Sequence, residues 1–420
     1  MDSSKYRIET EKNQAFLREI REDLLRFGRQ FPSPAGSSYY LGDDGTPWTN
    51  RPRETWITSR MAHVYSLAAM LKQDEPTPAG LPFADCRALA EQAVRGLLGE
   101  LRDTEHGGWF AGIAADGQIL PGKQCYAHAF VILAASSAYL AGIPGAEALL
   151  REALAVYDRF FWDEEAGLAA DTWDTGFMKL DDYRGLNANM HSVEAFLAVW
   201  DATGNPVYLK RAGRIIRRVT GWAEANGWRI PEHFTQDWQS DLDCNKDRPD
   251  DPFKPYGATP GHGIEWARLI LQYAAAAQDE DDPTSLTEAA AKLYDRAISD
   301  AWACDGAPGL VYTTDWSGKP VVHDRMHWTL AEAINTSAVL YRVTGGLRYS
   351  EDYAKFLQYL DRNMLDHAHG SWYHQLDRKN QVIGTVWPGK SDLYHAVQAT
   401  LIPYNPRVGV SIAAAVRARA

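Results

Sequence analysis

The chain has 420 residues, enough for one large domain or for two or three domains of average size. Acidic residues outnumber basic ones by 55 to 43, and the net charge of -12 argues against nucleic acid or an anionic membrane as the main partner. The N-terminal segment is charged throughout, and no stretch approaches the roughly 18 consecutive apolar residues of a membrane span, so we expect a cytoplasmic protein.

Predicted helices alternate with short turns that contain glycine. Apolar residues with a period of 3.6 predict helices at 16–31 and 56–71, which form the first predicted pair. Further along the chain, five turns are marked by Gly108, Gly167, Gly227, Gly309 and Gly370, at intervals of 59, 60, 82 and 61 residues. Each interval is close to the length of one helical hairpin, and the longest contains an acidic, linker-like stretch at 274–285.

These units, about six helix pairs in all, predict an all-α protein whose single domain spans residues 1–420. Gly142, Gly204 and Gly345 follow predicted helices, where glycine supplies a left-handed C-cap. Because the units are dissimilar in sequence, a closed ring of six helical hairpins, an (α/α)6 barrel, is favoured over an open solenoid. The longest loop-like stretch, at 240–257, is expected to be functional.

Three predicted helices carry a histidine and a second polar residue on one face. The pairs are His191 and Glu194, His262 and Glu265, and His395 and Gln398. In the helix at 187–200, an apolar stripe occupies one side and the polar pair lies on the other. In a helical barrel, that polar side would face the central cavity.

The start of the helix that contains His262 indicates what such a histidine can do. Thr259 fits the N-cap and Pro260 the first helical position, so His262 lies beside unpaired backbone N–H groups and the positive end of the helix dipole. This environment disfavours the imidazolium and favours a nearby oxyanion. We therefore expect His262 to act as a neutral base near pH 7, with Glu265 fixing its tautomer.

His191 and His395 stand in the same context, near predicted helix starts. The candidate caps are Asn187 or Asn189 for the first and Ser391 or Asp392 for the second. Three histidines in one kind of position form a joint signal. The remaining histidines lack it and are expected to be structural: His63, His106, His128, His233, His323, His327, His367, His369 and His374.

Neutral histidines without an obvious nucleophile fit proton transfer next to a sugar carbonyl. Removal of the C2 proton from an open-chain aldose gives an enediolate. Reprotonation at C1 completes an isomerisation, and reprotonation on the other face of C2 completes an epimerisation. The 15 Trp and 20 Tyr support a carbohydrate site, because such sites use flat aromatic walls.

Three other functions stay open at this point. The two His-x-x-Glu pairs fit a metal-assisted sugar isomerase, although further carboxylate ligands are missing and the four dispersed cysteines indicate no zinc site. A glycoside hydrolase needs two carboxylates across the sugar, for which Glu265, Glu332 and Asp392 are candidates. A noncatalytic sugar-binding protein would have no need of histidines at helix starts. No glycine-rich phosphate-binding motif occurs in the sequence.

Five ordered segments between about residues 50 and 405 carry a family pattern: "WITSRMAHVYSLAA", "KQCYAHAFVILAASS", "YRGLNANMHSVEAFLAVWDATG", "PFKPYGATPGHGIEWARLIL" and "WPGKSDLYHAVQATLIP". They resemble the mannose isomerase and sulfoquinovose isomerase branch of the N-acylglucosamine 2-epimerase superfamily. The resemblance implies an (α/α)6 barrel and aldose–ketose isomerisation of a monosaccharide through an enediolate, without metal or cofactor. A sugar 2-epimerase of the same superfamily is the alternative.

The resemblance also assigns roles to individual residues. His262 and His395 match the acid/base pair, and His191 matches a histidine that assists ring opening or holds the substrate. We expect His395 to take the C2 proton and His262 to help open the pyranose. Matching sugar-contacting or orienting positions are Arg60, Tyr126, Asn187 and Glu265, to which we add Trp328, Glu332 and Trp387. The sequence does not distinguish a monomer from a dimer.

Two positions depart from the sulfoquinovose branch. The resemblance places an arginine before the Phe of the FxxxGxTPGH segment and a glutamine near the last glycine turn, where both would hold a sulfonate. Here the two positions are Pro252 and His374. Without the bidentate grip of arginine, an uncharged hexose such as D-mannose is favoured. D-Lyxose is a plausible second substrate, because a pocket does not strongly reject a smaller analogue.

Overall fold

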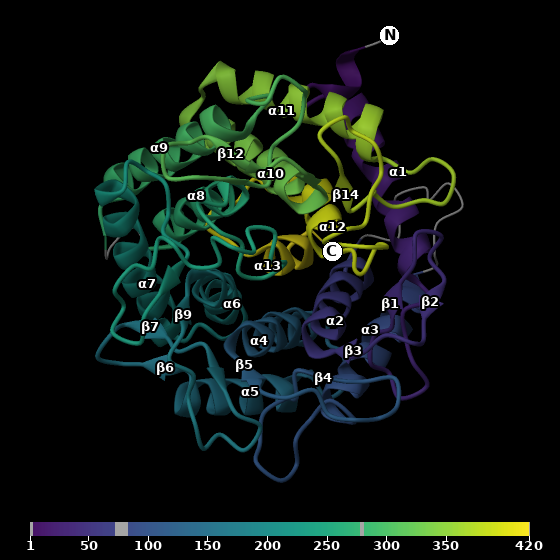
Figure 1. Ribbon diagram of the computed structural model, residues 1–420. Helices are drawn as coiled ribbons and strands as arrows, with labels where there is room; N and C mark the ends of the chain where they lie inside the picture. The colour runs from purple at the N-terminus through teal and green to yellow at the C-terminus, as the bar shows by residue number, and fades with distance from the viewer. Residues whose placement is uncertain (1–2, 72–82, 278–280, 420) are drawn as a thin grey trace.

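Two concentric rings of helices make up the fold (Figure 1). The computed structural model describes residues 3–71, 83–277 and 281–419. The inner ring consists of α2 (Thr55–Ala69), α4 (Cys125–Leu140), α6 (Leu186–Thr203), α8 (Pro260–Ala276), α10 (His327–Thr344) and α12 (Tyr394–Leu401). The outer ring consists of α1 (Glu11–Gly28), α3 (Phe83–Leu98), α5 (Ala146–Phe160), α7 (Pro206–Ala225), α9 (Pro283–Ala301) and α11 (Leu347–Tyr359). The predicted (α/α)6 barrel is confirmed.

The two rings differ in how their apolar residues are distributed. Outer helices are amphipathic: α5 buries Leu149, Ala153 and Tyr157 and turns its charged residues outward. Inner helices are apolar or small on almost every side, and α4 is buried along most of its length. An inner helix packs against two inner neighbours and an outer one, so nearly its whole circumference lies in the core. The polar face predicted for the helix at 187–200 is directed into the centre of the ring.

Each inner helix packs against the outer helix that follows it in the sequence, except where the ring closes. There, the last inner helix, α12, packs against the N-terminal helix α1. The prediction that helices 16–31 and 56–71 form the first hairpin is therefore wrong. Both helices exist, but α2 pairs with α3, and the sixth hairpin combines the two ends of the chain.

Short antiparallel strands tie together the open end of each hairpin. β3 (Arg53–Glu54), before α2, pairs with β4 (Gly112–Ile113), after α3. The equivalent pairs are β5 (Lys123–Gln124) with β8 (Thr172–Trp173), β9 (Arg184–Gly185) with β10 (His233–Phe234), and β13 (Arg325–Met326) with β14 (Gln375–Leu376). In the fourth hairpin a β-bridge between Ala258 and Thr314 takes the place of a strand pair. In the sixth, the N–H of Lys390 donates to the carbonyl of Leu41.

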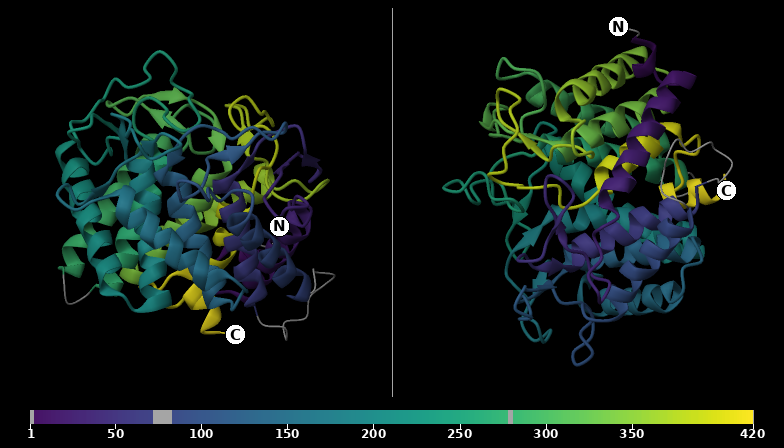
Figure 2. Two further views of the ribbon diagram at one scale, coloured as in Figure 1. Left: turned by 90° about the horizontal axis from the view of Figure 1, so that it is seen from below. Right: turned by 90° about the vertical axis from the view of Figure 1, so that its right-hand side faces the viewer.

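The remaining strands form small hairpins within the loops, at the same end of the barrel (Figure 2). They are β1 (Tyr40–Leu41) with β2 (Pro47–Trp48), β6 (Trp162–Asp163) with β7 (Leu168–Ala169), and β11 (Thr313–Thr314) with β12 (Pro320–Val322). The C-terminal helix α13 (Ile412–Arg417) lies at the opposite end and packs against α2, α4 and α6. No helix among residues 3–71, 83–277 and 281–419 is long and apolar enough to cross a membrane.

The glycine-marked turns link consecutive hairpins. All five marker glycines have positive φ, between 62° and 110°, which explains why glycine stands there. In three of these turns an aspartate binds a basic residue that precedes the next inner helix: Asp103 with Lys123, Asp305 with Arg325, and Asp366 with Lys390. Part of the predicted acidic linker, residues 278–280, lies outside the described residues.

The Asp103–Lys123 pair generates a prediction about stability. Lys123 is fully buried, and its Nζ lies 2.7 Å from Asp103 Oδ2. In Asp103→Ala the buried lysine would lose its counter-ion and either stay charged and unpaired or give up its proton, so we expect the free energy of unfolding to fall by about 3–5 kcal/mol. Urea denaturation would measure the change, with the exposed turn variant Asp116→Ala as the control. Equal midpoints for both variants would contradict the prediction.

Candidate active site

The candidate site is a pocket at the strand-bearing end of the barrel, where all six inner helices begin. Each inner helix contributes lining residues from its first two turns: Trp56 and Arg60 of α2, Tyr126 of α4, Asn187 and His191 of α6, His262 and Glu265 of α8, His327 and Trp328 of α10, and His395 of α12. The positive ends of six helix dipoles therefore converge on the pocket. This field disfavours an imidazolium and favours an oxyanion.

The structure brings together most of the residues that the sequence analysis selected. The pocket is lined by His191, His262, His395, Arg60, Tyr126, Asn187, Glu265, Trp328 and Trp387. Glu332 is the exception, because it is fully buried behind His395 and does not line the pocket. Its position suits the support of a histidine rather than contact with a sugar.

His262 lies in the first turn of α8, as predicted. Thr259 is the N-cap residue, but its side chain makes no capping bond, and its carbonyl accepts the N–H of His262 at 3.0 Å. The predicted partner of the imidazole was wrong. His262 Nδ1 lies 3.1 Å from Oε1 of Glu232, not beside Glu265. Glu232 is buried in the segment between α7 and β10. Because Nδ1 of His262 lies next to Glu232, the other ring nitrogen, Nε2, is the one available to the pocket.

His395 lies at the second position of α12, and its Nδ1 is 2.9 Å from Oε1 of Glu332. Asp392 accepts the N–H of Tyr394 at 2.9 Å, so one of the two predicted caps does bind at this helix start. Burial, together with Arg60, holds the pKa of the His395 imidazole well below its ordinary value. His395 is therefore a neutral base with one nitrogen committed to a carboxylate.

His191 lies two or four residues further into its helix than the predicted caps Asn187 or Asn189 imply, because α6 begins at Leu186 with Gly185 as its N-cap. Asn189 is not a cap: its side-chain amide is buried and binds the backbone of Ala169 and Gly185. His191 Nδ1 lies 3.5 Å from Glu194, the residue expected to share its face. Burial lowers the pKa of His191 to about 4.

Aromatic side chains form the walls of the pocket. Phe253 reaches it from the 240–257 loop and lies 5.3 Å from Trp387 and 6.1 Å from Trp56, measured between ring centroids. Trp328 lies 5.1 Å from the His262 ring. The prediction that the long loop contributes to function agrees with this position of Phe253, since flat rings of this kind pack against sugar rings.

Two histidines that we expected to be structural also line the pocket. His327 and His374 stack with their ring centroids 3.7 Å apart and an interplanar angle of 10°. The N–H of His327 donates to the carbonyl of His374 across the β13–β14 pair. His374 occupies the position at which the sequence departs from the sulfoquinovose branch, so the family resemblance could have identified it as a pocket residue. Nothing in the local sequence indicated His327.

A layer of buried charge lies beneath the histidines. Arg268 Nε binds Glu332 Oε2 at 2.8 Å, and its Nη2 lies 3.6 Å from Glu265 and 3.8 Å from Glu194. The side chains of His191, Glu194 and Glu265, and of Glu265, Glu332 and His395, are close enough to share a metal ion. The Arg268 guanidinium, however, already supplies the positive charge among the three carboxyl groups.

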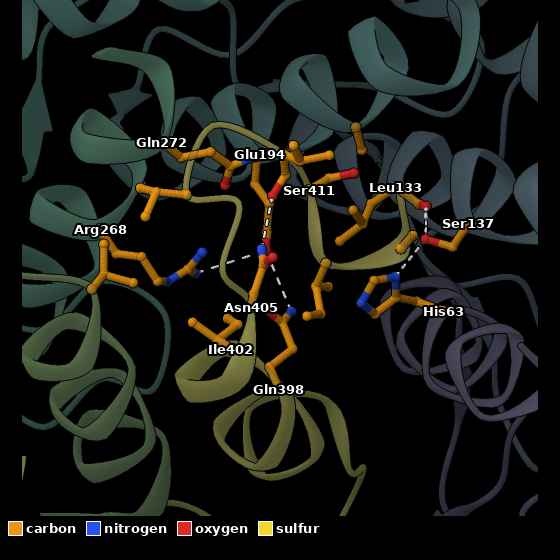
Figure 3. A pocket seen from close by; sticks show the side chains of 16 residues that line it. His63, Leu133, Ser137, Glu194, Arg268, Gln272, Gln398, Ile402, Asn405 and Ser411 are labelled. Atoms are coloured by element: carbon orange, nitrogen blue, oxygen red, sulfur yellow. Dashed lines mark hydrogen bonds and ion pairs between the residues drawn. The ribbon is translucent and has the colours of Figure 1, made fainter. Parts of the chain in front are cut away.

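A second cavity lies on the far side of this layer (Figure 3). Glu194 and Arg268 border it, together with Gln398 of α12 and with Asn405 and Ser411 of the segment that precedes α13. Gln398 donates to Glu194 at 3.3 Å, and Figure 3 shows these side chains directed toward one another. The charged layer therefore separates the pocket from the end of the barrel at which α13 lies.

The buried histidines predict how stability depends on pH. Burial lowers the pKa of His191, His327 and His63 to about 4, whereas histidine in an unfolded chain titrates near 6.5. Between these values the unfolded chain binds more protons, so the free energy of unfolding should fall as the pH drops from about 6.5 to about 4. Denaturant titrations across this range would measure the slope. His63→Gln, outside the pocket, should reduce it, and an unchanged slope would contradict the assignment.

Comparison with known proteins identifies the family to which the sequence is similar. Residues 36–399 match the family described as N-acylglucosamine 2-epimerase (GlcNAc 2-epimerase). The chain is 42% identical over 397 residues to a D-mannose isomerase of Thermobifida fusca, with 94% of this chain and 95% of that protein covered. It is 42% identical over 369 residues to a D-mannose isomerase of Pseudomonas cannabina pv. alisalensis, with 87% and 86% covered.

A solved structure agrees with these sequence relatives. The crystal structure of a D-mannose isomerase matches with a TM-score of 0.84 and 28% sequence identity, covering 93% of this chain and 97% of that one. The family match extends over most of the chain, from before α2 to within α12, and the residues that it spans carry the pocket. The chain belongs to the N-acylglucosamine 2-epimerase family.

Proposed function

We propose that this chain is an aldose–ketose isomerase that interconverts D-mannose and D-fructose without a metal or cofactor. One observation carries the proposal: His262 and His395 both face the pocket from helix starts, and each has a buried carboxyl group 3.1 or 2.9 Å behind its Nδ1. The Glu332 carboxylate accepts from Nδ1–H of His395 and leaves its Nε2 as a base directed toward the substrate, while Glu232 lies at ion-pair distance from Nδ1 of His262. Two such groups provide the acid/base pair that an enediolate reaction requires.

The expected roles follow the sequence assignment. His262 assists opening of the pyranose ring, and His395 then removes the proton from C2 of the open-chain sugar. The positive ends of the inner helices and the Arg60 guanidinium stabilise the negative charge that develops on the sugar oxygens. His395 returns the proton to C1, which gives the ketose. His191 lies beside Tyr126 and Phe130 and is placed to hold the substrate.

The charge balance of the pocket supports an uncharged sugar. Among the described residues that line it, the fixed cation is Arg60, whose Nη1 lies 3.2 Å from Asp392 and whose Nη2 donates to Tyr126 at 2.9 Å. Pro252, which replaces the arginine of the sulfoquinovose branch, also lines the pocket. These described lining residues therefore offer no second guanidinium to hold a sulfonate. D-Mannose fits this balance and the names of the relatives, and D-lyxose is the expected second substrate.

The alternatives gain less support. A glycoside hydrolase would need two free carboxyl groups across the sugar, but Glu332 lies behind His395 and Asp392 is paired with Arg60. Burial raises the pKa of Asp392, but Arg60, the N–H of Tyr394 and the neighbouring histidines together hold this pKa below its ordinary value, so this group is a poor general acid. A sugar 2-epimerase remains the second candidate, because the family description names one and the chemistry differs only at reprotonation.

The test is an NMR time course of chelator-treated protein with D-mannose in D2O. We expect fructose to appear, with deuterium at C1 to the extent that the abstracted proton exchanges with solvent. Glucose without fructose would instead make the chain a 2-epimerase. Conversion that occurs only after Mn²⁺ or Mg²⁺ is added would restore the metal-assisted alternative. No conversion of D-mannose or D-lyxose would contradict the proposal.

The two histidines should each be essential. We expect His395→Ala and His262→Ala to lower kcat by roughly 10²–10⁴-fold, the usual contribution of a general acid or base. Far-UV circular dichroism should match the wild type, because both side chains border a pocket rather than the packed core. A variant with wild-type kcat would remove its residue from the mechanism.

Glu232 should act through His262. In Glu232→Gln the amide can present its N–H to Nδ1 and favour the wrong tautomer, so kcat should fall on the order of 10²-fold or more. The matched control is Glu224→Gln, an exposed residue at the end of α7, which should keep wild-type kcat. If both variants behave alike, the Glu232–His262 contact has no part in the reaction.

A further inference from the structure

Glu265 presents to the pocket a carboxyl group that lacks a hydrogen-bond partner among the described residues. Its side chain is 1% exposed, its Oε1 accepts no hydrogen bond from them, and it lines the pocket. One of its oxygens lies within 4.8 Å of His191 and Glu194, and one lies within 4.8 Å of Glu332 and His395. A buried polar group between two pocket histidines therefore faces the space that a sugar would occupy.

The neighbouring carboxyl groups are better supplied with donors. Glu332 accepts from Arg268 Nε at 2.8 Å and from His395 Nδ1 at 2.9 Å. Glu194 accepts from the hydroxyl of Tyr394 and from Gln398. Arg268 Nη2 lies 3.6 Å from Oε1 of Glu265, which is beyond a hydrogen bond. Three carboxylates with one guanidinium would leave excess negative charge in a buried layer, and the poorest donor set belongs to Glu265.

The charge state of Glu265 follows from everything packed around it. The titratable and charged groups that face it are Glu332 and Arg268, Glu194 and His191, Arg60, Tyr126, Tyr394 and His395. Burial and the Glu332 carboxylate raise the pKa of Glu265 well above its ordinary value, and Arg268 offsets only part of this. These surroundings favour the neutral carboxylic acid form of Glu265 over its carboxylate.

We propose that the neutral Glu265 carboxyl group carries the proton that must move between O1 and O2 of the sugar during isomerisation. The inference rests on the proposed function. Isomerisation transfers hydrogen between C2 and C1, for which His395 is placed, but it also requires O1 to gain a proton and O2 to lose one. A protonated carboxyl group offers one O–H donor and one carbonyl acceptor side by side, which matches the two adjacent oxygens of a cis-enediol.

The step balances without a further reactant. His395 removes the C2 proton, the C–H electron pair forms the C1–C2 double bond, and O1 takes the proton of Glu265. The resulting Glu265 carboxylate then takes the proton from O2 as the C2 carbonyl forms. The electron pair of the double bond takes the proton from His395 at C1. Glu265 and His395 both end in their starting states, and the aldose has become the ketose.

Infrared spectroscopy tests the charge state independently of activity. The difference spectrum between wild type and Glu265→Gln at pH 7 should contain the carbonyl band of a protonated carboxylic acid, shifted in D2O and in protein with ¹³C-labelled glutamate. The same comparison with Glu288→Gln, an exposed residue of α9, should lack that band. Loss of a carboxylate band in place of the acid band would show that Glu265 is ionised and would overturn the proposal.

Kinetics with D-mannose test the role. In Glu265→Gln the new amide would be neutral and could still donate a hydrogen bond, but it could not pass a proton on. We therefore expect Glu265→Gln to lower kcat by roughly 10²–10⁴-fold while KM stays within a few-fold of wild type. Glu265→Asp keeps the acid and should be more active than Glu265→Gln. The reverse order, or wild-type kcat in Glu265→Gln, would overturn the proposal.

Different results would contradict the proposed isomerase function and the proposed role of Glu265. Wild-type protein that converts neither D-mannose nor D-lyxose would contradict the proposed function. Active wild type together with an active Glu265→Gln, or with an ionised Glu265, would contradict only the role of Glu265. If Glu265→Gln fails to fold, the acid band of labelled wild type and the kcat of Glu265→Asp still decide the question: no acid band, or a loss in Glu265→Asp as large as that expected for Glu265→Gln, would overturn the role.

Discussion

Six helices that are buried on nearly every side all begin at the same end of one ring, and the properties of the pocket depend on this arrangement. The first turns of these helices leave backbone N–H groups unpaired and turn six positive dipole ends toward one point. Burial and the dipole field both oppose a positive charge there, and the pKa values of His191 and His395 lie below the ordinary value for histidine. A hydrogen bond to Glu332 orients the ring of His395, and Glu232 lies 3.1 Å from Nδ1 of His262.

The same arrangement explains the charged layer below the histidines. Carboxyl groups beside the imidazoles add negative charge to a buried region, and an isolated buried charge is very costly. Arg268 compensates part of this charge, and its guanidinium binds Glu332 directly. One carboxyl group remains with too few donors, and that group is Glu265, which faces the pocket. The support of one histidine and the proton state of another residue are therefore linked through a single arginine.

Local patterns in the sequence predicted much of the fold and of the pocket. The glycine markers identified turns that require positive φ, and the histidines at helix starts identified three lining residues. Contacts between distant segments were not readable in this way. The i,i+3 spacing on one helix paired His262 with Glu265, but the actual partner, Glu232, comes from the segment that follows the preceding outer helix. Spacing along one helix carries no information about such a neighbour.

Two other differences have the same physical origin. Asn189 has the residue type of a helix cap, yet its amide is used in the core to satisfy the backbone of Ala169 and Gly185. His327 and His374 look like isolated histidines in the sequence, and only the pairing of β13 with β14 places them in contact. In each case a tertiary contact determines the role of a side chain whose local sequence favours another. The roles assigned to individual pocket residues stay predictions until they are measured.

The closure of the ring by α12 and α1 has a consequence for how the protein folds. Five hairpins join helices that are neighbours in the sequence, so each can form as the chain is synthesised. The sixth joins the two ends of the chain, for example through the bond from Arg21 of α1 to the carbonyl of Thr400 of α12, 379 residues apart, and the bond from Lys390 to Leu41. Contacts of such high sequence separation form slowly, because a long loop must be closed first. His395 lies on α12, so the last segment to join the ring also delivers a pocket histidine, and an incompletely folded chain lacks a finished pocket.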